Sequence, residues 1–117
     1  KKEYLWRTFS EDQIDLDFKN PSVLLRFIKI MIYLIQNGVT VLRLDAIAYL
    51  WKENSTKCIN LKQTHEIIKL FRIIINLLNV QTIIITETNL PEKENLSYFA
   101  FLKENLYPKH LPNLMRF

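Results

Sequence analysis

Glycine is almost absent from this sequence, which has one in 117 residues. An all-β protein built on tight turns usually needs more, because glycine supplies the left-handed conformations of such turns. Cysteine is equally scarce: Cys58 stands alone, so no disulfide can form within the chain. A lone thiol fits a reducing compartment. These two shortages argue against an all-β fold and exclude an internal disulfide framework.

The chain also lacks a long apolar run and a concentrated patch of charge. Its most apolar stretches are interrupted by Lys29, Lys69 and Arg72, and its first residues lack the apolar core of a signal peptide. Lys and Arg are scattered among acidic residues at a net charge of +4, whereas nucleic-acid proteins more often concentrate them. With 49% hydrophobic residues the chain is not disordered. We expect a soluble, cytoplasmic protein with no membrane or nucleic-acid partner.

Three segments carry a helical pattern. Residues 20 and 21, Asn-Pro, suit a helix start, and polar residues then recur every three or four positions until Asn-Gly at 37 and 38. A second helix is predicted over 62–79, with Arg72 on its polar face. A weaker helical pattern covers residues 94–106, and the segment 45–61 is predicted to be a long loop.

Two short, β-branched apolar runs, 39–44 and 82–86, predict buried strands. Strands that are apolar on both faces and alternate with helices imply a parallel sheet in an α/β fold. Two strands cannot close a barrel, and they leave both outer edges open. Either the partner strands lie elsewhere in a longer protein, which we favour, or the chain is a very small α/β domain.

Each predicted strand is followed by an acidic residue. Residues two apart in a strand point to the same face. One such series is Val41, Arg43 and Asp45, and the other is Ile83, Ile85 and Glu87. Active sites of parallel α/β proteins form at the C-terminal strand ends, and adjacent strands would hold two carboxylates at the roughly 5–5.5 Å of retaining glycosidases. Alternatively, Arg43 and Asp45 form a structural ion pair and Glu87 opens a solvent-exposed loop.

These residues resemble three motifs of the α-amylase superfamily, in the family's order. Residues 39–46, VTVLRLDA, are similar to the strand-four motif, in which an Arg precedes the nucleophilic Asp by two positions. Residues 84–89, IITETN, are similar to the strand-five motif, whose Glu is the acid/base. Residues 13–17, QIDLD, resemble a short motif before the helix that leads into strand four. The resemblance implies a partial (β/α)₈ TIM barrel containing the βα units around strands 4 and 5.

Within the superfamily, the fit is closest to the sucrose phosphorylase branch, including its glucosylglycerate phosphorylase-like members. The loop that begins RLDAIAYLWKE at residue 43 and the stretch 86–99 carry this resemblance. It covers about residues 4–99. We therefore expect residues 1–99 to be part of the catalytic barrel, and residues 100–117 to be a C-terminal stretch without a clear family match.

The resemblance implies a role for each charged residue at the strand ends. Asp45 would be the nucleophile, Glu87 the general acid/base, and Arg43 the group that orients Asp45 and keeps it ionised. The reaction would be a double displacement through a covalent glucosyl–Asp45 intermediate. Gln13, Asp15 and Tyr49 are further candidates for substrate binding. Their structural alternatives are bracing of a turn for Gln13 and Asp15, and packing against the barrel for Tyr49.

The implied substrates are a small α-glucoside, such as sucrose or glucosylglycerate, and phosphate as a possible acceptor, with no cofactor. Ala48 and Tyr49 replace the Lys-His pair of typical amylases, so we expect no calcium site and no other metal. The motifs after strands three and seven are absent, and the latter supplies a further catalytic Asp. An α-glucosidase or amylase-type hydrolase is one alternative function. A truncated, non-catalytic gene product that self-associates is another.

Overall fold

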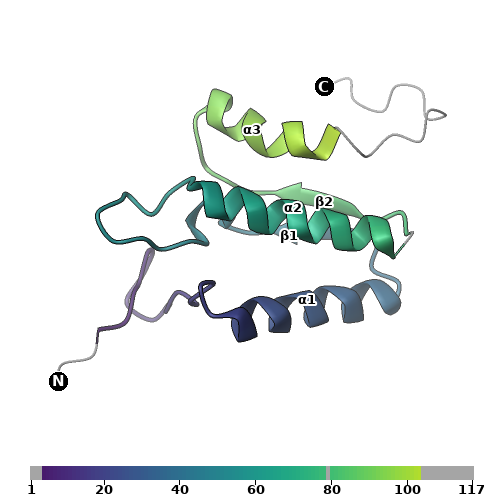
Figure 1. Cartoon of the computed structure of the whole chain (residues 1–117), viewed down its shortest axis with the longest axis horizontal. Helices are drawn as coiled ribbons and strands as arrows, with labels where there is room; N and C mark the ends of the chain where they lie inside the picture. Colours follow the sequence, from purple (N-terminus) through teal and green to yellow (C-terminus); the bar gives the residue numbers. More distant parts are fainter. Residues whose placement is uncertain (1–3, 79, 104–117) are drawn as a thin grey trace.

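Helices and strands alternate along the chain in the predicted order. The computed structural model describes residues 4–78 and 80–103. The elements are α1 (Pro21–Gln36), β1 (Val41–Leu44), the short 3₁₀ helix η1 (Ile47–Tyr49), α2 (Lys62–Leu77), β2 (Ile83–Thr86) and α3 (Glu92–Lys103) (Figure 1). The prediction of a small α/β arrangement with parallel strands is confirmed. The predicted C-terminal stretch lies largely outside the described residues, as do Asn79 and residues 104–106 of the expected helices.

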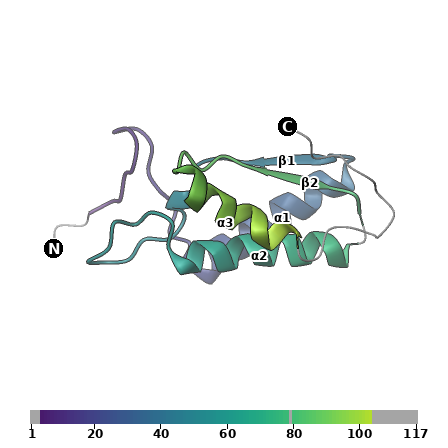
Figure 2. The ribbon, with the colours of Figure 1, turned by 90° about the horizontal axis from the view of Figure 1, so that it is seen from above.

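The two strands are parallel neighbours joined through α2. Val41 lies opposite Ile83, and Leu44 lies opposite Thr86. Figure 2 shows the helices on one side of this pair, and no element of the described chain covers the other side. Alternation along each strand therefore separates residues that face the helices from residues that face away from them.

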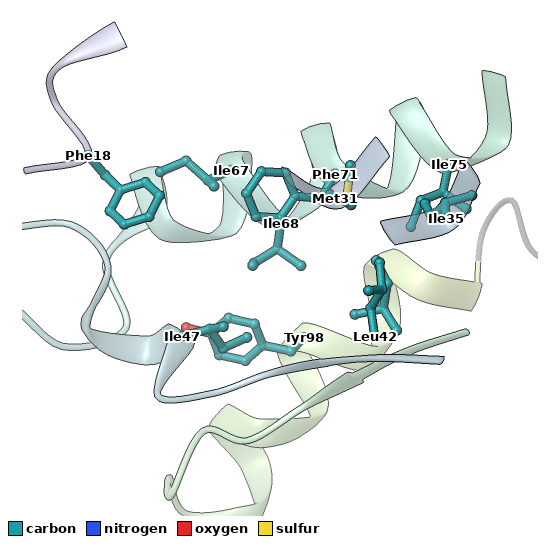
Figure 3. Close-up of a cluster of buried hydrophobic side chains, with 11 residues drawn as sticks. Phe18, Met31, Ile35, Leu42, Ile47, Ile67, Ile68, Phe71, Ile75 and Tyr98 are labelled. Carbon is teal, nitrogen blue, oxygen red and sulfur yellow. The ribbon is translucent and has the colours of Figure 1, made fainter. Parts of the chain in front are cut away.

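The core lies between the sheet and the helices. From the strands, Leu42 and Ile84 are buried toward the helices. They meet apolar side chains of α1 and α2 and the fully buried Tyr98 of α3 (Figure 3). The remaining members of this cluster are Phe18, Met31, Ile35, Ile47, Ile67, Ile68, Phe71 and Ile75. One face of each strand is thus packed as the apolar pattern predicts.

The other face of the strand pair is apolar but uncovered. Val41, Ile83 and Ile85 keep 47%, 60% and 50% of their surface exposed. The sequence predicts open outer edges for two strands that cannot close a barrel, and within the described chain the outer edge of each strand is unpaired. Exposed apolar residues on a sheet favour association with further apolar surface.

The ends of α1 form as the sequence indicates. The Asn20 side chain accepts a hydrogen bond of 2.9 Å from the backbone N–H of Ser22, which caps the first turn. After the helix, Gly38 has a backbone φ of +90°, which residues with a Cβ rarely adopt. None of the helices among the described residues has the length and apolar character needed to cross a membrane.

The placement of Arg72 on an exposed polar face of α2 is wrong. Arg72 is buried, and its Nη1 donates a hydrogen bond of 3.3 Å to the carbonyl oxygen of Thr82, just before β2. A buried carbonyl needs a donor, and a long guanidinium side chain can supply one while its stem packs against apolar neighbours. Burial lowers the pKa of Arg72. The spacing of polar residues along α2 cannot reveal a hydrogen bond from this helix to the segment that connects it to β2.

Replacing Ile85 with Thr tests the uncovered face. Ile85→Thr keeps a β-branched side chain and removes exposed apolar surface, so we expect less self-association of the 117-residue chain at nearly unchanged thermal stability. The neighbouring buried Ile84 is the matched control: Ile84→Thr should destabilise the fold by about 1–3 kcal/mol. Size-exclusion chromatography with light scattering and thermal melting would measure both effects. Equal self-association of wild type and Ile85→Thr would contradict the expectation.

Candidate active site at the C-terminal ends of the strands

Asp45 and Glu87 follow β1 and β2 directly. Leu44 lies opposite Thr86, and the backbone N–H of Glu87 donates a hydrogen bond of 2.9 Å to the carbonyl oxygen of Leu44. Strand pairing therefore continues to the point where each strand ends. Because both carboxylates follow their strands by one residue in this register, they lie at neighbouring positions, as the sequence predicts.

Arg43 joins the two carboxylates on the uncovered face of the sheet. Its Nη2 lies 3.7 Å from Oδ1 of Asp45 and also forms an ion pair with Oε2 of Glu87. The pair with Asp45 was expected, but the contact with Glu87 was not. Glu87 is therefore held by a cation from the adjacent strand, which differs from the alternative in which it opens a solvent loop. Because all three side chains are partly exposed, water weakens these attractions.

The chain turns sharply immediately after Asp45. Ala46 adopts φ +49°, in the left-handed region, and η1 begins at the next residue. This conformation costs a residue with a Cβ about 1 kcal/mol or more. The burial of Ile47 and Ala48 directly after the turn offsets that cost. The turn thus leaves Asp45 at the exposed strand end while the following residues enter the core.

Three of the six predicted site residues border one open hollow of about 260 Å³. These are Asp15, Asp45 and Tyr49, and apolar side chains including Phe9 complete the walls. The rings of Phe9 and Tyr49 meet edge to face, with centroids 5.2 Å apart. The hollow is smaller than the ~300–1,000 Å³ of most ligand pockets.

Gln13 does not border the hollow. It is exposed in a turn, and its backbone N–H donates a hydrogen bond of 3.2 Å to the carbonyl oxygen of Ser10. Arg43 and Glu87 are not among the residues of the hollow either, although they lie beside Asp45. The structure thus brings the charged trio together at the strand ends and places Gln13 apart from it.

Lys52 fastens the N-terminal segment to the loop after β1. Its Nζ lies 2.6 Å from Oδ2 of Asp15 and donates hydrogen bonds to Oγ1 of Thr8, at 3.0 Å, and to the carbonyl oxygen of Tyr49. Only 13% of the Lys52 side chain and 15% of the Asp15 side chain remain exposed. Burial raises the pKa of Asp15, but hydrogen bonds from Lys52 and Thr8 outweigh burial and hold it below its ordinary value. The Asp15 carboxylate is therefore engaged by the protein itself.

Sequence reasoning missed Lys52 because no local pattern distinguishes it from any other lysine in a loop. Its partner Thr8 is 44 residues away, so periodicity carries no information about the contact. The thiol of Cys58 is buried, and its Sγ forms hydrogen bonds with the backbone N–H and carbonyl oxygen of Glu53. Among the residues that the structure describes, no group of three or more His, Cys, Asp or Glu side chains is placed to hold a metal ion.

Comparison with known proteins gives a consistent set of similarities. The sequence profile of the α-amylase catalytic domain matches residues 1–106. The chain is 49% identical over 113 residues to a glucosylglycerate phosphorylase of Spirochaeta thermophila, covering 95% of this chain and 19% of that protein. It is 49% identical over 97 residues to a glucosylglycerate phosphorylase of Escherichia coli, covering 83% of this chain and 17% of the relative.

A more distant similarity links the chain to a trehalose synthase/amylase of Mycolicibacterium smegmatis. The two are 28% identical over 100 residues, which is 86% of this chain and 17% of the relative. The chain thus spans less than a fifth of the length of each of these curated relatives. The profile match extends past residue 99, where the motif resemblance ends.

Removing the Lys52 ammonium should destabilise this segment. Lys52→Met keeps much of the stem but leaves a partly buried Asp15 carboxylate without its cation, so we expect a loss of about 1–3 kcal/mol in the free energy of unfolding at pH 7. Lys57→Met, an exposed lysine of the same loop, is the control and should change stability by less than about 0.5 kcal/mol. Urea unfolding would measure both.

The pH dependence of that loss follows from the lowered pKa of Asp15. A carboxylate whose pKa is lower in the folded state stabilises the fold at any pH above its unfolded-state pKa, which is near 3.9. This stabilisation is lost as the pH falls through the folded-state pKa. The difference between wild type and Lys52→Met should therefore narrow below about pH 4. A difference that stays constant between pH 7 and pH 3 would show that the ion pair is not its cause.

Proposed function

Because the chain belongs to the α-amylase catalytic-domain family, whose profile matches residues 1–106, we propose that it is a segment of a glucosyl-transferring barrel enzyme. The family fold is a TIM barrel, and two parallel strands with helices on one side are consistent with part of such a barrel. The uncovered apolar face of Val41, Ile83 and Ile85 would then be the part of the sheet that packs inside the barrel. Asp45 and Glu87 would lie at its catalytic end.

The proposed reaction is the phosphorolysis of glucosylglycerate. Two relatives that are each 49% identical to this chain are glucosylglycerate phosphorylases, which supports this substrate over sucrose. Phosphate would replace glycerate at the anomeric carbon, so that glucosylglycerate and phosphate yield glucose 1-phosphate and glycerate. The whole protein would bind both substrates with the help of residues outside this chain.

The placement of two carboxylates at adjacent strand ends is the observation that carries the proposed mechanism. In the first step Asp45 attacks the anomeric carbon while protonated Glu87 gives its proton to the departing glycerate oxygen. The bond from the anomeric carbon to that oxygen breaks as the bond to Asp45 forms. In the second step a hydroxyl oxygen of phosphate attacks the anomeric carbon and gives its proton to Glu87. The bond from that carbon to Asp45 breaks, which frees the Asp45 carboxylate, and the configuration at the anomeric carbon is retained.

Arg43 would help the two carboxylates exchange roles between these steps. In the free protein its guanidinium lies beside both Asp45 and Glu87. In the first step Glu87 would carry a proton and Asp45 would be the anionic partner of Arg43. Once Asp45 carries the glucosyl group it has lost its negative charge, so Glu87 then becomes the anionic partner of Arg43. A nearby cation favours the ionised form of a carboxylic acid. The second step, which requires ionised Glu87, would be favoured at the moment when it is needed.

The test of this function is phosphate-dependent release of α-glucose 1-phosphate by the complete protein. Glucosylglycerate should support release, and omission of phosphate should suppress cleavage. Sucrose in place of glucosylglycerate would separate the two branches of the phosphorylase family. Equal release of free glucose with and without phosphate would instead identify a hydrolase and overturn the proposal.

Substitution of the two carboxylates should have different consequences. In the complete protein Asp45→Asn should reduce turnover by roughly 10⁴-fold or more, because an amide cannot form the glucosyl ester. Glu87→Gln should cost about 10²–10⁴-fold with glucosylglycerate but much less with glucosyl fluoride, since a good leaving group needs little protonation. Initial rates with both donors would measure this. Near-normal activity of Asp45→Asn would show that another residue is the nucleophile.

The 117-residue chain alone should show no turnover. Glucosyl transfer needs charge stabilisation at the developing oxocarbenium ion, and the family's third carboxylate has no counterpart in this sequence. Loops from other strands are also needed to enclose the sugar. Incubation of the purified chain with glucosyl fluoride would test this. Turnover that Asp45→Ala abolishes would contradict the expectation and would mean that a residue of this chain replaces the missing carboxylate.

A further inference from the structure

Three elements meet at Asn60, near the end of the loop after β1. Its backbone N–H donates a hydrogen bond of 2.8 Å to the carbonyl oxygen of Ala48, in η1. Its side-chain Nδ2 donates a hydrogen bond of 3.1 Å to Oε2 of Glu94, in the first turn of α3. Its Oδ1 lies 2.8 Å from Nε2 of His65, in α2. Asn60 thus contacts three elements: η1, which follows β1; α2, which precedes β2; and α3, which follows β2.

These contacts connect the segments that follow the two carboxylates. Ala48 is fully buried and lies three residues after Asp45. The hydrogen bond from Asn60 to Ala48 therefore joins the two ends of the loop that follows β1. Glu94 belongs to α3, which follows β2 and Glu87. A stack of the His65 ring on the buried Tyr98 ring, with centroids 4.3 Å apart, joins the same two helices nearby. Asn60 is therefore a polar link between the loop after Asp45 and the helix after Glu87.

We propose that Asn60 is a positioning residue, which sets the loop wall beside Asp45 relative to the helix that follows Glu87. That wall contains Tyr49 and is braced by Lys52 through the Tyr49 carbonyl. The consequence for turnover rests on the function proposed above, whereas the physical coupling between the loop and α3 does not.

The chemistry of the position accounts for an asparagine. Asn60 has φ +55°, in the left-handed region that asparagine tolerates better than most residues. Its amide can donate to a carboxylate and accept from an imidazole N–H at the same time. Aspartate would lose the donor and bring a second carboxylate against Glu94. Glycine would keep the backbone conformation and lose both side-chain bonds.

The coupling should affect substrate binding more than the chemical step. Pairing of β1 with β2 holds Asp45 and Glu87 at adjacent positions independently of Asn60. Loss of the Asn60 bonds would therefore leave the two carboxylates in place and loosen the wall that contains Tyr49. A looser wall raises the cost of ordering the site around a substrate, and this cost appears in KM.

Hydrogen exchange on the chain tests the coupling itself. Glu94→Ala removes the acceptor for Asn60, whereas Glu92→Ala removes another acid from the same helix turn and serves as the control for the helix dipole. We expect the amides of Leu50 and Asn60, which donate to the carbonyls of Ile47 and Ala48, to exchange about threefold to tenfold faster in Glu94→Ala only. Equal exchange in the two variants would overturn the proposal.

Kinetics of the complete protein test the consequence. Asn60→Gly should raise KM for glucosylglycerate by about threefold to tenfold with kcat changed less than twofold. Ser55→Gly, at another left-handed position of the same loop, is the control and should leave both constants unchanged. A variant that is merely less stable would lower kcat with the folded fraction at constant KM, and that result would overturn the positioning role.

A second pair of variants separates the side-chain bond from the backbone. Asn60→Asp should raise KM because two carboxylates then face each other, and Glu94→Gln in that background should lower KM again. Failure of this rescue would overturn the role of the Asn60–Glu94 bond. If the wild-type protein transfers no glucosyl group, the proposed function fails, and the hydrogen-exchange comparison alone decides whether Asn60 couples the loop to α3.

Discussion

Hydrogen bonds between β1 and β2 determine which residues of the two strands lie opposite one another, and the candidate site depends on that register. Leu44 opposite Thr86 brings Asp45 and Glu87 to the same end of the sheet on the same side as Arg43. A slip of one residue would turn every side chain of one strand to the other face. Glu87 would then point toward the helices, where an unpaired carboxylate is costly to bury. Packing of Leu42 and Ile84 against the helices opposes such a slip.

The same register explains why this sheet has one packed face and one charged, partly apolar face. Below the strand ends, the uncovered side presents Val41, Ile83 and Ile85, and Arg43 lies among them. An arginine there would be poorly placed in a purely apolar layer. Its guanidinium is instead close to two carboxylates, which compensate its charge. The transition from apolar to charged residues along one face therefore marks where the apolar part of that face ends and the candidate site begins.

Much of the fold and the charged trio can be predicted from the sequence, because both are local patterns. The β-branched runs, the Asn20 cap and Gly38 indicate where elements begin and end, and alternation alone puts Arg43 and Asp45 on one face. The remaining features depend on contacts between distant segments. Neither the bond from Arg72 to the Thr82 carbonyl nor the contacts of Lys52 leave a trace in periodicity. The motif around residues 13–17 indicates Asp15, but only the structure shows that its oxygens are already engaged by Thr8 and Lys52.

The contact between Lys52 and Thr8 also bears on the order in which this part of the protein assembles. It joins residues 44 positions apart, and α1, β1 and η1 lie between them in the chain. Contacts of large sequence separation carry a loop-closure cost and form late unless other contacts precede them. We therefore expect the hollow beside Asp45 to be completed after the strand pair and its helices. A newly synthesised chain would bring Asp45 and Glu87 together before it completes the hollow that Asp15 and Tyr49 border.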